Sequence, residues 1–244
     1  MRNALRLHDK SVVWHKLNEH LRARQRRSVR LRALDWCRSN AGVADAFAQS
    51  LDAELWSESL EYEAAARSHA KARLASLGVE LGGGGHYPLL YFLVRHFRPK
   101  TVVETGVAAG YSSHAVLSAL EINQRGILWS SDLPYLRLDD PERFIGYLVD
   151  DASLRSRWHL LTEGDNRNLQ EIVRRCGPID LISYDSDKSY RGRQTAMNRL
   201  LPQLRPGGMI LMDDIQDNLY FRDLIERHRM PWWLFEFEGK YLSL

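Results

Sequence analysis

The chain has 244 residues, enough for one sizeable domain and an appendage. Hydrophobic residues make up 44% and charged residues 27%, a composition typical of a globular protein and not of a disordered one. No apolar run approaches the roughly 18 residues of a membrane span, so no membrane partner is expected. No apolar leader segment follows the first residues, and Cys37 and Cys176 form no metal-binding or disulfide pattern. We therefore expect a cytoplasmic location.

Basic residues are concentrated in residues 1–40. This segment has a net charge of +8, which leaves −5 for the remainder of the chain. Such a cluster suits nucleic acid, an anionic surface or an acidic substrate, but it is also typical of a solvated helix face. We interpret it as a helix face and do not expect nucleic acid as a partner.

Two helical stretches come first in the chain. Apolar residues recur at helical spacing over 12–37, and residues 43–76 are rich in alanine and glutamate. Four glycines at 82–85 then interrupt any helix and predict either a linker or a flexible loop at the mouth of a site. We expect two units, a helical N-terminal extension (1–81) and a main domain (82–244). The extension is also a candidate surface for a homodimer.

From residue 85 onwards, short apolar runs alternate with helical segments. After a helix over 89–97, strands are expected at 101–105, 127–132, 158–163, 179–185 and 209–213. Helices are expected between them, over 113–121, 169–174 and 191–204. This alternation predicts an α/β fold with a parallel, Rossmann-like sheet covered on both faces. The final runs, 232–238 and 240–244, predict a hairpin and therefore an antiparallel last strand.

The loop after the first predicted strand indicates a nucleoside-like ligand. It contains Gly106 and Gly110, but lacks the middle glycine of a dinucleotide fingerprint. Glu104 at the strand end would repel a diphosphate and suits a cationic amine. S-adenosylmethionine carries an ammonium and a sulfonium but no phosphate, so the loop favours this cofactor over NAD.

Polar residues in chain order extend this cofactor site. Tyr111 and Ser112 offer amide and hydroxyl groups at a helix start, where a carboxylate can be held. Asp132 is placed to hydrogen-bond a ribose, and polar groups after the third strand can contact adenine. The complete predicted set is Glu104, Gly106, Ala108, Gly110, Tyr111, Ser112, Asp132, Leu133, Asp165, Asn166 and Asp185.

The motifs resemble those of a known family. TVVETGVAAGYSS, beginning at Thr101, is similar to the first motif of class I methyltransferases, and its GYS ending to that of the catechol and caffeoyl-CoA O-methyltransferases. IDLISYDSDKSY, LLPQLRPGGMILMDDI and FEFEGKYLSL resemble a bacterial group that includes sugar and antibiotic O-methyltransferases. The resemblance covers about residues 85–244 and implies a seven-stranded sheet with the last strand reversed.

Four carboxylates follow the fourth and fifth predicted strands: Asp185, Asp187, Asp213 and Asp214. Adjacent parallel strands would bring them to one edge, where a hard divalent cation such as Mg²⁺ removes their mutual repulsion. The resemblance implies that Asp185, Asp213 and Asp214 are the metal ligands, and we assign Asp187 to a helix cap. It also implies that Lys188 is the base that takes the substrate's hydroxyl proton, although sugar-type relatives more often have histidine there. A salt bridge is the alternative role for Lys188.

The sequence thus predicts a metal-assisted O-methyltransferase, with Lys188 and Asp185 as catalytic residues and a small hydroxylated molecule as substrate. The loops expected to surround the substrate contribute His86, Tyr87, Tyr190 and Asn218. Three alternatives stay open: a metal-independent methyltransferase acting on another acceptor such as RNA, a NAD-dependent oxidoreductase, and a non-catalytic nucleoside-binding module.

Overall fold

A computed structural model describes residues 27–75, 77, 81, 85–135 and 137–244. Within these residues, seven strands form one sheet in the order β3-β2-β1-β4-β5-β7-β6. The strands are β1 (Thr101–Thr105), β2 (Ile127–Ser131), β3 (Trp158–Leu161), β4 (Ile179–Tyr184), β5 (Leu204–Met212), β6 (Leu234–Phe237) and β7 (Lys240–Ser243). β7 runs antiparallel to both β5 and β6, whereas the pairs from β3 to β5 are parallel. The predicted fold class and the reversed last strand are confirmed.

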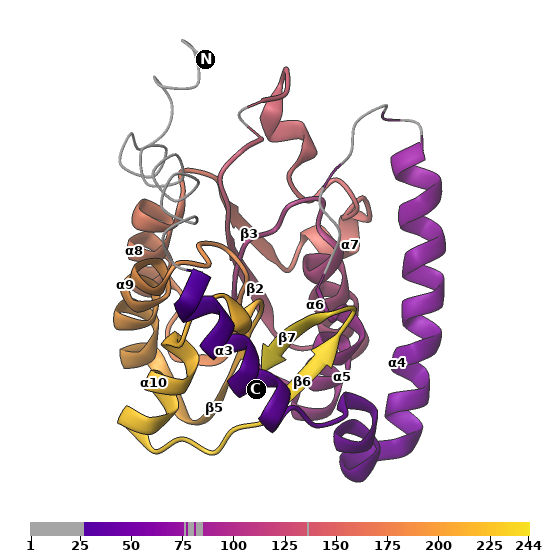
Figure 1. The fold of residues 1–244 in the computed structure, drawn as a ribbon. Helices are drawn as coiled ribbons and strands as arrows, with labels where there is room; N and C mark the ends of the chain where they lie inside the picture. Colours follow the sequence, from indigo (N-terminus) through magenta and orange to yellow (C-terminus); the bar gives the residue numbers. More distant parts are fainter. Residues whose placement is uncertain (1–26, 76, 78–80, 82–84, 136) are drawn as a thin grey trace.

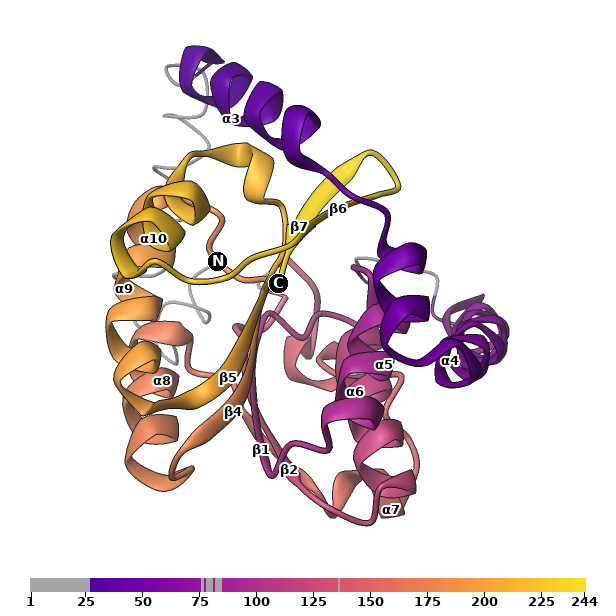
Figure 2. The same ribbon diagram turned by 90° about the horizontal axis from the view of Figure 1, so that it is seen from below.

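Helices cover both faces of the sheet (Figures 1 and 2). One face carries α8 (Asp165–Arg175), α9 (Tyr190–Leu200) and α10 (Tyr220–His228), and the other carries α5 (Tyr87–Phe97), α6 (Tyr111–Ile122) and α7 (Ala152–Arg155). Neighbouring residues of a strand point to opposite faces. Accordingly, Val102 and Leu181 belong to the hydrophobic core under α5 and α6, whereas Val103 and Ile182 belong to the core under α9 and α10.

The two N-terminal helices pack in different places, α4 against α5 and α3 against η4 and the hydrophobic core on the α10 side. α3 (Arg27–Asn40) is followed by α4 (Ala44–Ala75), which is kinked at Asp52. Trp56 of α4 is 2% exposed and makes an edge-on contact with Phe92 of α5, with ring centroids 5.7 Å apart. Between the two helices, the Gly42 amide donates to the Leu234 carbonyl and covers part of the edge strand β6.

Some predictions on the N-terminal part lie outside the described residues: the helix over 12–26 and the glycines at 82–84. The division of the chain at residue 81 stays a prediction. No described helix is long and apolar enough to cross a membrane.

Several segments differ from the expectation. Neither α7 nor α10 was predicted. The predicted helix over 191–204 ends at Leu200, and the short 3-10 helix η3 (Leu201–Gln203) follows, because Pro202 removes a helical N–H donor. β5 begins at Leu204, five residues earlier than expected, because Leu204 pairs with Ile179 across a register shift in the ladder. Two further 3-10 turns are η2 (Pro141–Phe144) and η4 (Ile215–Asp217).

Candidate active site

The β1–α6 loop needs its two glycines. Gly106 has φ +82°, and a Cβ atom there would lie 2.5 Å from the Asp185 carbonyl oxygen. Gly110 has φ +99°, and its Cβ would lie 2.8 Å from the Cα of Gly146. A side chain is therefore excluded on both conformational and steric grounds. The contact at Gly106 also places the loop directly beside the end of β4.

The start of α6 keeps backbone donors available for a ligand. Gly110 is the N-cap residue of α6 and supplies no side-chain hydrogen bond to the first turn. The first N–H groups of a helix have no partner within it, and the helix dipole favours an anion there. Tyr111 and Ser112 begin this turn, and Ala108 precedes it in the loop with φ +49°. These residues lie where the sequence predicted a carboxylate-binding turn.

Glu104 lies beneath this loop. It is 1% exposed, and its carboxylate accepts hydrogen bonds from Ser112 Oγ (2.6 Å), Ser113 Oγ (2.6 Å) and Ser130 Oγ (2.7 Å). Burial raises the pKa of Glu104, and the three hydroxyls act in the opposite direction. Glu104 therefore ties β1, β2 and α6 together. A direct contact between Glu104 and the ligand's amine stays a prediction.

Asp132 holds the same loop from β2. Its Oδ2 accepts from the amides of Val107 (2.9 Å) and Ala108 (2.7 Å), and its Oδ1 accepts from the amide of Leu133 (2.6 Å). A carboxylate can accept about four hydrogen bonds, so these three leave room for a ribose hydroxyl.

The predicted adenine-side residues join the loops after β3 and β4. Asp165 accepts hydrogen bonds from Ser131 Oγ (2.6 Å) and Ser186 Oγ (2.5 Å). Ser186 lies next to Asp185, so this contact connects the β3 and β4 loops. Asn166 accepts from Arg199 Nη2 on α9 at 2.6 Å. Asp165 and Asn166 thus occupy the same edge of the sheet as Asp132.

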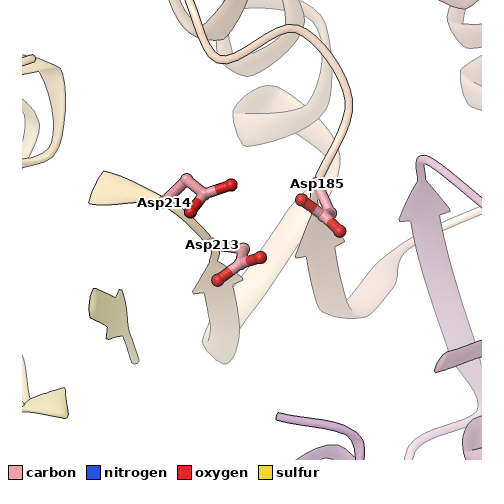
Figure 3. Close-up of side chains that lie close together, drawn as sticks. All are labelled: Asp185, Asp213 and Asp214. Carbon is pink, nitrogen blue, oxygen red and sulfur yellow. The ribbon is translucent and has the colours of Figure 1, made fainter. Parts of the chain in front are cut away.

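Three carboxylates meet at the ends of β4 and β5 (Figure 3). Asp185 follows β4, and Asp213 and Asp214 follow β5. One oxygen atom from each lies within 4.8 Å of the other two. All three residues are partly buried. Hard oxygen donors at this spacing suit a divalent cation such as Mg²⁺.

The ammonium of Lys188 lies among these carboxylates. Its Nζ contacts Asp185 Oδ1 and lies 3.1 Å from Asp214 Oδ2 and 3.7 Å from Asp213 Oδ2. Burial lowers the pKa of Lys188, although Asp213 and Asp214 act in the opposite direction. This position of Lys188 is compatible with both predicted roles, a base and a salt-bridge partner.

Arg193 of α9 binds the backbone of the two acids that follow β5. The sequence analysis did not identify it as a site residue. Its side chain is fully buried, and Nη2 donates to the carbonyl oxygens of Asp213 (2.9 Å) and Asp214 (2.8 Å). Nε and Nη1 find no hydrogen-bond acceptor among the described residues. Arg193 is buried in α9 together with Ala196, Met197 and Leu200, but its charge argues for a solvent position when the sequence alone is considered.

Asp187 lies outside the carboxylate cluster, in the turn that leads into α9. Its Oδ1 accepts from the Ser189 amide at 2.9 Å. Ser189 itself is the N-cap residue of α9, and its hydroxyl accepts from the Gly192 amide. Asp187 therefore lies in the turn before α9, and the helix cap that the sequence assigned to it is made by Ser189 instead.

The four predicted substrate residues fall into two groups. His86 and Tyr87 line a small cavity that also borders Ser112, Asp185 and Asp213. His86 caps α5 and stacks on Phe237, and its burial lowers its pKa to about 4.

The second group lies on the far side of Lys188. Asn218 is 6% exposed and donates to the Lys188 carbonyl at 2.7 Å, which fixes the backbone of that residue. Tyr190 donates to Asp223 at 3.0 Å and packs edge-on against Tyr220, between α9 and α10. The four residues therefore do not surround one common space.

This sheet order, with a reversed β7 and a glycine loop after β1, defines the class I methyltransferase fold. Residues 103–215 match a family model described as a methyltransferase domain. The matched segment is less than half of the chain, and together with the fold it supports the S-adenosylmethionine-dependent methyltransferase that the motifs predicted. No curated protein matches the chain.

Solved structures share the fold. The O-methyltransferase TomG from Streptomyces achromogenes, involved in tomaymycin synthesis and solved with S-adenosylmethionine, superposes with a TM-score of 0.57 at 17% identity. The match covers 80% of this chain and 98% of TomG. An O-methyltransferase from Bacillus cereus, solved with S-adenosylhomocysteine, gives a TM-score of 0.55 at 18% identity over 82% of this chain and 95% of its own.

Proposed function

We propose that this protein transfers the methyl group of S-adenosylmethionine to a hydroxyl oxygen of a small molecule, assisted by a divalent cation. The observation that carries the proposal is the carboxylate cluster beside the glycine loop. Gly106 contacts the Asp185 backbone, so the cofactor loop and the cluster share one edge of the sheet. A ligand held by the loop is thereby next to acidic residues that can position an acceptor.

The cluster fits a divalent cation by its chemistry. Asp185, Asp213 and Asp214 supply hard oxygen donors, and the Lys188 ammonium already places a positive charge among them. The cation would be held by these three carboxylates and would supply Lewis acidity, which lowers the pKa of a substrate hydroxyl. Asp213 and Asp214 are in turn fixed by Arg193 through their carbonyls.

The chain's own residues contribute positioning and proton transfer. Lys188 Nζ lies at the cluster and is the group placed to accept the hydroxyl proton, and its burial favours the neutral amine that this role requires. The substrate oxygen then attacks the methyl carbon in line with the carbon–sulfur bond, which breaks and releases S-adenosylhomocysteine. Bringing two bound partners together accounts for most of the acceleration.

The remaining features of the proposal follow from the same site. The loop residues from Gly106 to Ser112, with Asp132, Asp165 and Asn166, would hold S-adenosylmethionine. A small molecule with vicinal hydroxyls, such as a catechol or a saccharide, suits a metal that binds two oxygens. The proposal includes cytoplasmic action and a homodimer formed through the N-terminal helices.

Metal-independent transfer is the second candidate, and one observation favours it. The three carboxylates are already opposed by three cations. Lys188 lies within the cluster, Lys240 Nζ is 3.6 Å from Asp214 Oδ1, and Arg193 lies underneath. Charge balance therefore does not by itself demand a metal ion.

Turnover in the presence and absence of a chelator separates the two candidates. If the metal is required, chelation abolishes formation of S-adenosylhomocysteine by the wild type and added Mg²⁺ restores it. Asp213→Ala and Asp214→Ala should each lose activity that Mg²⁺ does not restore. Glu171→Gln, which removes a surface charge on α8, serves as the control. Full turnover of both alanine variants with chelator present would show that the metal role is wrong.

A further inference from the structure

A large groove lies beside the carboxylate cluster, between α3 and the β6–β7 hairpin. Figure 2 shows α3 lying next to this hairpin, and the groove has a volume of about 920 Å³. Ligand sites for small molecules are typically of about 300–1,000 Å³. Apolar surface comes from Leu31 and Leu34 of α3, and polar groups come from the hairpin and from η4.

The groove borders the carboxylate cluster at Asp214, which lines it. Asp214 Oδ2 faces Lys188 at 3.1 Å, and Asp214 Oδ1 faces Lys240 of the groove at 3.6 Å. One carboxylate thus borders both spaces. A molecule lying in the groove would reach the cluster with one end.

Three cationic and three carboxylate side chains line the groove, and the cations of its two ion pairs are more exposed than their carboxylate partners. Arg30, Arg38 and Lys240 line it, and the side chains of Arg30 and Lys240 are 66% and 58% exposed. The Asp214 carboxylate is less accessible, since its side chain is only 15% exposed. Asp217 is held by Arg30 at 3.4 Å, which leaves Glu236 as the exposed acid of the lining.

Two arginines of the basic N-terminal segment (residues 1–40) line the groove. They are Arg30 and Arg38, which lie on α3, eight residues and about 80° of helical rotation apart. Both residues are exposed to solvent, so their charges can reach a ligand that lies in the groove.

We propose that this groove is the acceptor-binding site and that its acceptor carries an anionic group, a carboxylate or a phosphate, in addition to the hydroxyl that is methylated. The inference rests on the proposed function, whose acceptor it specifies. Arg30, Arg38 and Lys240 bind the anionic group by charge-assisted hydrogen bonds. Leu31 and Leu34 contact the apolar body, and the hydroxyl points toward Asp214.

Two matched probes test the charge requirement: 3,4-dihydroxybenzoate, which carries a carboxylate, and catechol, which does not. Binding is measured by isothermal titration to protein saturated with S-adenosylhomocysteine. The wild type should bind 3,4-dihydroxybenzoate at least about tenfold more tightly than catechol. Arg30→Gln combined with Arg38→Gln should reduce this preference to less than about threefold. Arg32→Gln, on the same helix but outside the groove lining, should leave it unchanged.

Three outcomes would overturn the inference: no binding of either probe, equal affinity for both in the wild type, or a preference that survives in the Arg30→Gln/Arg38→Gln variant. Each single variant is measured as well, with circular dichroism to confirm that the fold is retained. Titration of S-adenosylmethionine alone judges the proposed function separately. Cofactor binding without a preference for the anionic probe would reject the groove assignment and leave the methyltransferase proposal intact.

Discussion

The Lys188 ammonium and a metal ion would occupy the same position among the three carboxylates, so the charge at residue 188 should control the affinity for Mg²⁺. The Lys188 ammonium contacts Asp185 and lies 3.1 Å from Asp214 Oδ2. A cation bound by the three carboxylates would occupy that space, so Nζ must leave when the metal enters. Replacing Lys188 with methionine, which has a similar length and no charge, should therefore increase the affinity for Mg²⁺.

The magnitude follows from the distances. A divalent cation at the centre of the cluster would lie within roughly 4 Å of the present Nζ position, where it and the ammonium repel by about 8 kcal/mol at an effective dielectric constant of 20, twice the value for two unit charges. The lysine side chain is flexible and can move aside, so that only part of this repulsion opposes the metal. A residual of about 1.4 kcal/mol corresponds to a tenfold change in affinity. We expect Lys188→Met to bind Mg²⁺ at least about tenfold more tightly.

Isothermal titration with Mg²⁺ measures the affinity, and thermal unfolding gives a second readout. Without metal, Lys188→Met leaves three carboxylates without their ammonium, so Mg²⁺ should raise its melting temperature more than that of the wild type. Lys240→Met is the matched control, because it removes the same charge from the same Asp214 but lies outside the cluster and is largely exposed. Its affinity should change by less than about threefold.

Two results would refute this reasoning. An equal gain in Lys240→Met would mean that net charge alone sets the affinity, and that Lys188 does not occupy the metal's position. A lack of Mg²⁺ binding in both the wild type and Lys188→Met would contradict the metal site itself.

Three further predictions concern the support of the site. Arg193→Met removes two charge-assisted hydrogen bonds to the β5 end and should lower the free energy of unfolding by about 2 kcal/mol, measured with urea; an unchanged midpoint would be inconsistent with this role. His86 has a pKa of about 4 in the fold, so the unfolded state binds its proton first, and stability should fall by up to about 3 kcal/mol as pH drops from 6.5 to 4. His86→Asn, which retains a capping side chain, should show a weaker pH dependence of stability, and an identical pH profile would disprove the assignment. Gly106→Ala should abolish S-adenosylmethionine binding in calorimetry because its Cβ would meet the Asp185 carbonyl, and wild-type affinity would contradict the loop geometry.

The sheet was predictable because its signals are local. Apolar runs such as those of β1 and β4 are buried on both faces, and such runs identify parallel strands without tertiary information. The same holds for the glycine loop and for the acids that follow β4 and β5, because strand ends of a parallel sheet meet at one edge. Their assembly into a cluster follows from strand order, which β4 and β5 satisfy as neighbours.

Other features depend on tertiary contacts that no local pattern records. The sequence related Glu104 to the cofactor's amine, but it did not reveal the hydroxyls of Ser112, Ser113 and Ser130 that α6 and β2 bring to its carboxylate. Arg193 is charged, so a helical pattern assigns it to solvent, whereas the fold places it under Asp213. The groove likewise could not be predicted from the sequence, because α3 and the β6–β7 hairpin are about 200 residues apart in the chain.

Titration with S-adenosylmethionine and with NAD, each with and without Mg²⁺, tests the central claim most directly. The loop lacks the dinucleotide glycine pattern and rests on the buried Glu104. We therefore expect S-adenosylmethionine to bind and NAD not to bind, with Mg²⁺ binding measurable in the same protein. Binding of NAD without binding of S-adenosylmethionine would contradict the account.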